Sequence, residues 1–480
     1  MELAVRPVAE ARSVARRLPA TVVTIAVAAA ACLPGLGRQP LSWDESVSVA
    51  AARRSLPQLG HLLAHTDAPL GLYYLGLHGW IWLVRAAGFG LTETWVRLPS
   101  ALAAIAAVGL ATRLGERIYG RGIALLAGIL LSAWPVFEFY SRDARPYAAT
   151  VLAVLSSTVL LLNASLDPRW WRVTLYAVTL ATAIYLQLFA VLALLPQFGV
   201  VLRAEHRRKL LIAQAAAVAS TLPLLWVSWP QSGEVGWIPP ITGWRIAGFL
   251  VTVCGGAGIA GLLVLLAIAV RKNAGEHGFS GLLYGQAVLP PLLLIVGSLG
   301  VSVLVPRYAL VAVPAIALIT ARAIAFLPRP RRLAFGSLVV IAGLTTSLIQ
   351  RQSPYKYEDF RAITDHIEDH AHAGDTVRFD PASYRVGFSY YTGRDPLSVY
   401  PADNAASGEY RGDTIGGVPR QTPASDRIWL LTDGRRGAVP VSYHAIWSRH
   451  FGVVTLELLD RLPLRRTTAL VVRGGPAAPG

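Results

Sequence analysis

Long apolar segments recur along most of the chain, and they limit the folds open to it more than any other feature. A helix needs about 20 predominantly apolar residues to cross the hydrocarbon core of a bilayer. Of the 480 residues, 54% are hydrophobic and only 15% are charged. An average soluble domain is near a quarter charged. The sequence therefore predicts a polytopic α-helical membrane protein that contacts the lipid bilayer.

The pattern of apolar segments predicts about eleven transmembrane helices within residues 1–350. They cover about residues 18–36, 98–114, 122–139, 148–166, two parts of 170–202, 210–228, 246–270, 282–304, 309–327 and 333–349. The stretch 170–202 is too long for one span, so we divide it near Gln187. A further apolar helix, about 69–84, carries tyrosine and tryptophan residues that suit the membrane interface, and we expect it to lie along the outer face.

Basic clusters between the apolar segments indicate the orientation. The chain holds 44 Lys and Arg against 28 Asp and Glu, a net charge of +16. Clusters at residues 12–17, 203–209 and 329–332 all fall on one side of the predicted membrane, as the excess of positive charge on cytoplasmic loops requires. This distribution explains the charge without nucleic-acid binding. It places the N-terminus in the cytoplasm and the residues after 350 outside.

Residues 351–480 are more polar and predict a separate, small α/β domain. Short β-like runs cover about residues 375–380, 428–432, 455–459 and 469–473. A helical pattern covers about residues 358–371. We therefore divide the chain into a transmembrane domain, 1–350, with a first outer loop at 37–97, and an extracytoplasmic domain, 351–480.

Two adjacent carboxylates, Asp44 and Glu45, lie where the first predicted span emerges into water. Ser42 and Glu45 have the spacing of a capping box, and acidic residues favour the first turn of a helix, so helix capping alone is one interpretation. The other is that Asp44 and Glu45 are catalytic, with Asp44 as the catalytic carboxylate. The two are compatible, because a cap would hold the Asp44 backbone rigidly at the membrane surface.

His65 and Asp67 follow in the same outer loop. Asp67 can be interpreted as the N-cap of a helix with Pro69 in its first turn. Alternatively, His65 and Asp67 bind substrate. Together with Asp44 and Glu45 they could hold a divalent ion, although their spacing is not that of a known metal site.

The outer loop after the third span contains Arg142, Asp143, Arg145 and Tyr147. Arginines on this side oppose the positive-inside bias, so they are expected to have an anionic partner. A phosphate suits them, because a guanidinium group binds phosphate oxygens in a bidentate manner. An internal pairing of Arg142 with Asp143 is the alternative.

Arg307 and Tyr308 repeat this pattern at the outer end of the ninth span. Arg307 and Arg97 can also be interpreted as arginines at helix ends whose charged heads reach the interface. The outer face thus collects carboxylates and arginines. Because the sequence has neither a P-loop nor a GxGxxG fingerprint, a nucleotide-sugar substrate is disfavoured and a lipid phosphate is favoured.

Several stretches in one order resemble the GT-C superfamily of glycosyltransferases. Within it they resemble the protein O-mannosyltransferase and aminoarabinose-transferase-like group (glycosyltransferase family 39), in particular bacterial members of mannosyltransferase type. The stretches are WDESVSVAAA, HTDAPLGLYYLGLHGW, VRLPSALAAIAAVGLATRLGERIYG, YSRDARPY, RYALVAVPAIALI and KYEDFRAITDHIEDHAHAGDTVRFDP. One departure is Asp67-Ala68-Pro69-Leu70, where relatives often carry two consecutive prolines.

The resemblance implies transfer of a sugar, mannose in our prediction, from a polyprenyl-phosphate donor with inversion at the anomeric carbon. The acceptor would be a protein, a glycan or a lipid on the outer side. Asp44 matches the general base of this group, Glu45 its neighbour, and Arg142 and Arg145 the contacts to the donor phosphate. We predict no cofactor and no obligatory metal, because arginines can neutralise a monophosphate leaving group.

A transporter or lipid flippase is the main alternative, because charges inside a membrane protein also mark transport pathways. The charges here gather on one side, and the sequence lacks the internal duplication of many transporters. A third interpretation is that the C-terminal domain recruits a partner and the membrane part serves as its scaffold.

Overall fold

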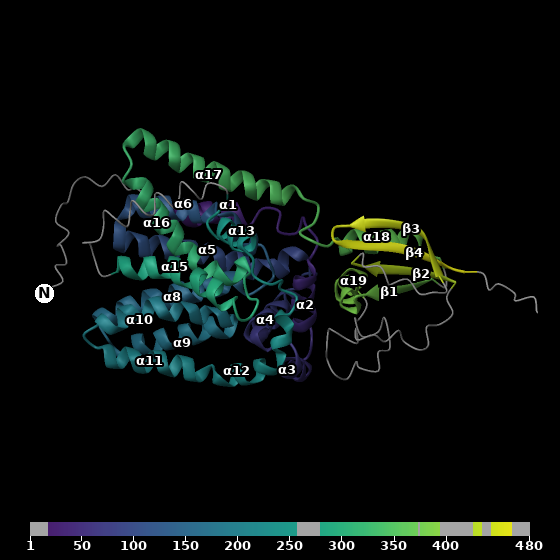
Figure 1. The fold of residues 1–480 in the computed structure, drawn as a ribbon, viewed down its shortest axis with the longest axis horizontal. Helices are drawn as coiled ribbons and strands as arrows, with labels where there is room; N and C mark the ends of the chain where they lie inside the picture. Colours follow the sequence, from purple (N-terminus) through teal and green to yellow (C-terminus); the bar gives the residue numbers. More distant parts are fainter. Residues whose placement is uncertain (1–17, 257–278, 373–374, 394–425, 434–442, 463–480) are drawn as a thin grey trace, which may run out of the picture. The chain divides into compact units, whose positions relative to one another are not determined.

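The structure is a computed structural model that describes residues 18–256, 279–372, 375–393, 426–433 and 443–462. The chain divides into two compact units, with the boundary between Lys356 and Tyr357. Figure 1 shows a helical first unit and a smaller second unit with a sheet. The boundary predicted after residue 350 lies inside a helix that runs to Gln352.

The described part of the first unit is helical. Its first half contains α1 (Ala20–Cys32), α2 (Trp43–Ala52), α3 (Leu56–His65), η1 (Ala68–Leu70), α4 (Gly71–Ala86), α5 (Glu93–Tyr119), α6 (Arg121–Ser132), α7 (Pro135–Ser141) and α8 (Tyr147–Leu166). Its second half contains α9 (Trp170–Leu186), η2 (Leu188–Ala193), α10 (Leu194–Arg203), α11 (Arg207–Ser220), α12 (Leu222–Ser228), η3 (Trp229–Val235), α13 (Gly243–Val253), α15 (Ser280–Gly297), η4 (Pro306–Ala312), α16 (Val313–Ala325) and α17 (Arg329–Gln352).

Six helical segments of the described chain are long and apolar enough to cross a membrane, and the pair α6–α7, bent by 63°, would make a seventh. The six segments, without the bent pair, cover residues 93–119, 147–166, 207–233, 280–297, 306–325 and 329–352. The predicted break near Gln187 is confirmed, because α9 ends at Leu186 and η2 follows. The eighth predicted span is only partly described, by α13, and residues 257–278 lie outside the described residues. The predicted count of eleven is therefore not confirmed.

Small residues allow the helices around α5 to pack closely. Helix α5 packs against α1, α6 and α8, and Figure 1 shows it among these helices. Its buried side includes Ala101, Ala104, Ala107 and Ala111. A side chain at Gly128 on α6 would overlap Thr24 of α1. Without a strong hydrophobic drive between helices in lipid, such close packing is what holds them together.

The second unit is a small α/β fold. It comprises α18 (Phe360–His370), β1 (Thr376–Asp380), η5 (Ala382–Tyr384), α19 (Arg385–Thr392), β2 (Arg427–Thr432), β3 (Tyr443–Phe451) and β4 (Val454–Arg461). The strand order is β1-β2-β4-β3, with β1 and β2 parallel and the other pairs antiparallel.

The structure confirms the helix predicted near 358–371 and the strands predicted near 375–380, 428–432 and 455–459. The strand predicted at 469–473 lies outside the described residues. Strand β3 was missed because most of its side chains are exposed, so its sequence lacks the alternation of apolar and polar residues that marks a half-buried strand.

Candidate active site

The first outer loop enters α2 through the predicted capping box, which the structure confirms. The backbone N–H of Ser42 donates to a Glu45 carboxylate oxygen at 3.0 Å, and the Glu45 N–H donates to Ser42 Oγ at 3.4 Å. This exchange satisfies two backbone donors at the helix start. The two neighbouring carboxylates differ in exposure. The Glu45 side chain is fully buried, whereas 28% of the Asp44 side chain is exposed.

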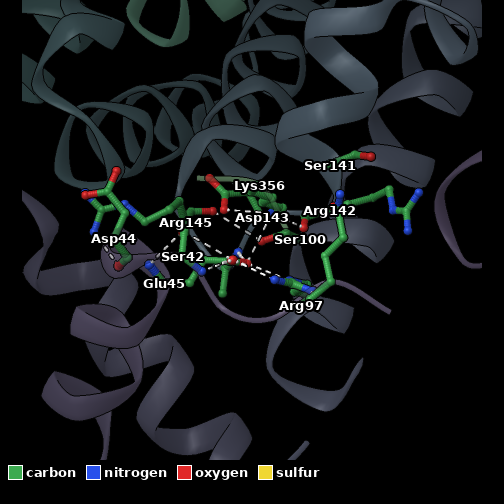
Figure 2. A network of polar contacts seen from close by, with 12 residues as sticks. Ser42, Asp44, Glu45, Arg97, Ser100, Ser141, Arg142, Asp143, Arg145 and Lys356 are labelled. Atoms are coloured by element: carbon green, nitrogen blue, oxygen red, sulfur yellow. Dashed lines mark hydrogen bonds and ion pairs between the residues drawn. The ribbon is translucent and has the colours of Figure 1, made fainter. Parts of the chain in front are cut away.

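Glu45 is the centre of a buried polar network (Figure 2). Arg97 binds both of its carboxylate oxygens, at 2.6 and 2.7 Å. The backbone N–H of Ala144 donates to the same carboxylate at 2.9 Å, and Lys356 Nζ lies 3.3 Å from it. Burial opposes ionisation of Glu45, but the charges of Arg97 and Lys356 outweigh it and hold the pKa of Glu45 well below its usual range.

Arg97 holds the first loop in place. Its guanidinium donates to the carbonyl groups of Leu36, Gln39 and Pro40 at 2.6 to 2.8 Å, in addition to Glu45. Only 1% of the residue is exposed. The interpretation of Arg97 as an arginine that reaches the interface is therefore wrong. Its position three residues before Ser100, at the start of an apolar span, gave no signal of this role.

Asp44 lies between two arginines from distant parts of the sequence. Arg307 Nη1, from η4, donates to Asp44 Oδ2 at 2.9 Å. Arg145 Nη2 lies 3.8 Å from Asp44 Oδ1, and Arg145 Nη1 donates to the Asp44 carbonyl at 3.3 Å. Burial raises the pKa of Asp44, but the charges of Arg145 and Arg307 outweigh this effect and lower it. Asp44 is therefore an ionised carboxylate in an electropositive setting.

Both arginines keep hydrogen-bonding capacity for a further anion. The Nε atoms of Arg145 and Arg307 are buried and have no hydrogen-bond partner. A buried donor without a partner is costly, and a ligand oxygen would remove that cost. Their guanidinium groups, next to a partly exposed carboxylate, form a site that can accept a phosphate.

Aromatic rings surround Arg307. Its guanidinium carbon lies 5.8 Å from the ring centre of Tyr147, 5.7 Å from Tyr308 and 5.1 Å from Trp237. Tyr308 also stacks on Phe189 at 4.3 Å. The structure thus brings the predicted Tyr147 and Tyr308 to the arginine site. Trp237 was not predicted, and its exposed ring in a loop rich in tryptophan and proline offered only a weak signal.

Arg142 and Asp143, in the same loop before α8, have partners other than Asp44. Arg142 donates to the Gly35 carbonyl at 2.7 Å and pairs with Glu138, one helical turn earlier, at 3.3 Å. Asp143 pairs with Lys356 at 3.1 Å. The alternative in which Arg142 pairs with Asp143 is therefore not what the structure has. The geometry brings Arg145, and not Arg142, to Asp44.

His65 does not join the carboxylate pair, and Asp67 acts on the site only through Arg145, whose pKa its charge helps to raise. His65 is exposed, and its ring contacts the carbonyl and the ring of His61 in its own helix. Asp67 is at the N-cap position of η1 but makes no side-chain cap bond, and its carboxylate instead accepts from Tyr74 Oη at 2.9 Å. Across the described ranges, no three His, Cys, Asp or Glu side chains are placed to hold a metal, so the suggested divalent-ion site lacks a ligand set there.

Comparisons with known proteins bear on this arrangement. The model of a family described as dolichyl-phosphate-mannose-protein mannosyltransferase matches residues 77–230. The crystal structure of apo ArnT from Cupriavidus metallidurans aligns with a TM-score of 0.60 at 14% identity, covering 91% of this chain and 97% of that chain. No curated protein sequence matches the chain significantly. The family model thus matches part of the chain, and the likeness to ArnT shows that the two chains share a fold.

Two further structures are similar to this chain. ArnT from the same organism bound to undecaprenyl phosphate aligns with a TM-score of 0.55 at 13% identity, covering 91% of this chain and 97% of that chain. Arabinosyltransferase EmbB from Mycobacterium smegmatis aligns with a TM-score of 0.46 at 16% identity, covering 84% of this chain and 42% of that chain. The fold shared with ArnT agrees with the prediction of a polytopic helical membrane protein that has a small C-terminal α/β domain.

Proposed function

We propose that this chain is a glycosyltransferase that moves mannose from a polyprenyl-phosphate donor to an acceptor hydroxyl on the extracytoplasmic side, with inversion. The observation that carries the proposal is the partly exposed Asp44 carboxylate beside two arginines with unused donors. The description of the matching family supports mannose. The undecaprenyl phosphate bound to ArnT supports a polyprenyl carrier. The labelled product of the transfer assay identifies the acceptor as a protein, a glycan or a lipid.

The reaction would be a single displacement at the anomeric carbon. Asp44 takes the proton of the acceptor hydroxyl while that oxygen bonds to the anomeric carbon. The bond from that carbon to the phosphate oxygen breaks through an oxocarbenium-like transition state. The electron pair leaves with the polyprenyl phosphate, and Arg145 and Arg307 stabilise its growing charge. Asp44 then releases the proton to water.

The pairing of Asp44 with the arginines describes the enzyme before the donor binds. A carboxylate held by two guanidinium groups is a weak base, because its pKa is lowered. A donor phosphate would compete for the same guanidinium groups. Asp44 would then lose part of its pairing and become a stronger base when the substrate is present. The two guanidinium charges also match a monophosphate, so we propose that the reaction needs neither a metal nor a cofactor.

We propose a positioning role, and not a catalytic one, for Glu45. All of its side chain is buried, and its oxygens are occupied by Arg97, Ser42 and Ala144. It therefore has no path to an acceptor hydroxyl. Its capping box and the Arg97 pair instead fix the first turn of α2, which carries Asp44.

The test is transfer of label from radiolabelled polyprenyl-phosphate-mannose by the purified protein, with a membrane extract as acceptor source. Asp44→Asn keeps the shape of the side chain but removes the base. We expect it to lower the transfer rate at least about a hundredfold, as removal of a general base commonly does. NMR of the product would show whether the anomeric configuration has inverted.

The matched control is Asp167→Asn, which alters a half-exposed aspartate that pairs with Arg169 and Arg172 away from the site. It should transfer at the wild-type rate. Equal transfer rates in Asp44→Asn and the wild type would mean that Asp44 is not the general base and serves only in the first turn of α2. If neither protein transfers mannose, the donor sugar proposed here is wrong, and polyprenyl phosphates carrying other sugars are compared in the same assay.

A further inference from the structure

Lys356 is a buried lysine that the proposed mechanism does not use. Only 4% of its side chain is exposed. Its Nζ donates to the carbonyl of Arg142 at 2.7 Å, to Asp143 Oδ1 at 3.1 Å and to Glu45 Oε1 at 3.3 Å. All three donors of the ammonium group are thus used, and Figure 2 shows Lys356 beside Asp143 within the network.

The partners of Lys356 are neighbours in sequence of the two groups proposed to act on substrate. Glu45 follows Asp44 directly, and Asp143 stands two residues before Arg145. One ammonium group therefore ties the start of α2 to the loop between α7 and α8. A lysine suits this place, because a buried carboxylate needs a paired charge and two carboxylates share this one.

The segment that delivers Lys356 is anchored on both sides of the site. The amide nitrogen of Gln39 donates to the carbonyl groups of Gln350 and Ser353 at 3.0 and 2.9 Å. Arg351 Nε donates to Glu138 at 3.0 Å, on α7. The last turn of α17 and the residues up to 356 that follow it thus bind both the first outer loop and α7 before Lys356 reaches the network.

We propose that Lys356 is a positioning residue for the transfer reaction, holding Glu45 and Asp143 together so that Asp44 and Arg145 face the same substrate. The proposal rests on the proposed function. It adds a residue that comes from the far end of the first unit, more than 300 positions after Asp44 in the sequence. A misplacement of about 1 Å can lower a rate about a hundredfold, so the ion pairs need not touch substrate to matter.

The ion pair between Lys356 and Asp143 should make the effect of Lys356 on the transfer activity depend on pH. Burial raises the pKa of Asp143 to about 6, with the charges of Glu45 and Asp44 acting in the same direction and Lys356 acting against them. Arg142 and Arg145 flank Asp143 on its own segment. As the pH falls through about 6, Asp143 binds a proton and its ion pair with Lys356 is lost.

The experiment compares Lys356→Met, Lys356→Arg and the wild type in the mannose-transfer assay. We expect Lys356→Met to lower kcat about tenfold to a hundredfold at pH 7.5 and to raise the donor KM only a few-fold. Lys356→Arg keeps the charge and should recover most of the activity. The ratio of wild-type to Lys356→Met activity should shrink between pH 7.5 and pH 5, because the wild type then loses one of the two ion pairs that Lys356→Met removes. Lys209→Met, at an exposed lysine of α11, should behave as the wild type.

A purely structural lysine would give a different result. The loss in Lys356→Met would then be the same at every pH, would follow the loss of folded protein in a thermal melt, and would not be recovered by arginine. Full activity in Lys356→Met would also overturn the proposal.

A second readout separates this proposal from the proposed function. If the wild type transfers no mannose, the protection of each protein from heat by undecaprenyl phosphate is measured instead. Weaker protection of Lys356→Met, with normal protection of Lys356→Arg, supports the positioning of Arg145 even then. Equal protection of all three proteins overturns it.

Discussion

At the scale of single residues, burial separates two carboxylates that are adjacent in the sequence. Glu45 is closed off by Arg97 and Lys356, whereas Asp44 keeps part of its side chain exposed. Helical geometry explains the difference, because successive residues of a helix point about 100° apart. One carboxylate therefore faces the packed loop and the other faces the arginine site.

Arg307→Gln tests the electrostatic state of Asp44. Burial raises the pKa of Asp44, and Arg307 and Arg145 lower it, so removing Arg307 should raise it. A base must be ionised, and a higher pKa means that activity is lost at a higher pH. In the kcat/KM profile for the donor, we expect the loss of activity caused by protonation of Asp44, which lies below the loss caused by Asp143 near pH 6, to move up by about one pH unit. A nearby opposite charge shifts a pKa by about that much or more. The donor KM should also rise.

The control for this experiment is Arg169→Gln, which removes an exposed arginine paired with Asp167. Its pH profile should match that of the wild type. An unchanged acidic limb in Arg307→Gln would mean that Arg307 does not set the pKa of Asp44 in the working enzyme.

At the scale of elements, α17 is placed by small residues. Its buried residues are Gly336, Gly343 and Ser347, which lie on one side of the helix. Gly343 packs directly on the carbonyl of Ala133, at the bend between α6 and α7. The same helix carries Arg351, which donates to Glu138 on α7, about two turns further on.

Gly343→Ala should disturb this packing. The added methyl group would overlap the carbonyl oxygen of Ala133, which belongs to the backbone and cannot turn away. Overpacking of this kind costs about 1 to 3 kcal/mol. We expect a thermal midpoint several degrees lower and a lower transfer rate. The measurement is a melt of the detergent-solubilised protein together with the mannose-transfer assay.

Gly336→Ala is the matched control on the same helix. A methyl group there would meet Leu126 and Ile324 at 3.9 and 4.0 Å, which is ordinary contact. The control should be neutral or slightly stabilising, because alanine favours a helix over glycine. Equal effects of the two substitutions would show that α17 is not held by the contact at Ala133.

At the scale of the whole molecule, charge predicts orientation. We expect the basic cluster at residues 203–209 to lie in the cytoplasm and the C-terminal unit to lie outside. Glu205 and Glu368 are both exposed, one in each region, so they make a matched pair of labelling sites.

Cysteines at these two sites test the topology. In a chain with Cys32→Ala and Cys254→Ala, Glu368→Cys should react with a membrane-impermeant maleimide on intact cells. Glu205→Cys should react only after the cells are permeabilised. The same labelling of both sites on intact cells would contradict the predicted topology. Labelling of Glu205→Cys alone on intact cells would mean that the protein has the opposite orientation in the membrane.

The sequence by itself determined the class of the molecule and most of its helices. Apolar segments of bilayer length, basic clusters and the break near Gln187 are local features, and the structure reproduces the break. The capping box at Ser42 and Glu45 was also readable, because all of its partners lie within four residues. Asp44, Arg145 and Arg307 could be named as charged groups on one side of a predicted membrane.

Only the tertiary structure decided which of these charges meet. Asp44 and Arg307 are separated by 263 positions, and Lys356 lies 311 positions from Glu45. No periodicity spans such distances, so these two pairs and the burial of Arg97 were not predicted. The pairing of Arg142 with Glu138 was also not predicted, although the two residues have the i, i+4 spacing of helix neighbours. Ion pairs depend on how helices pack and on which side chains are removed from water, and the chain sets these only once it has folded.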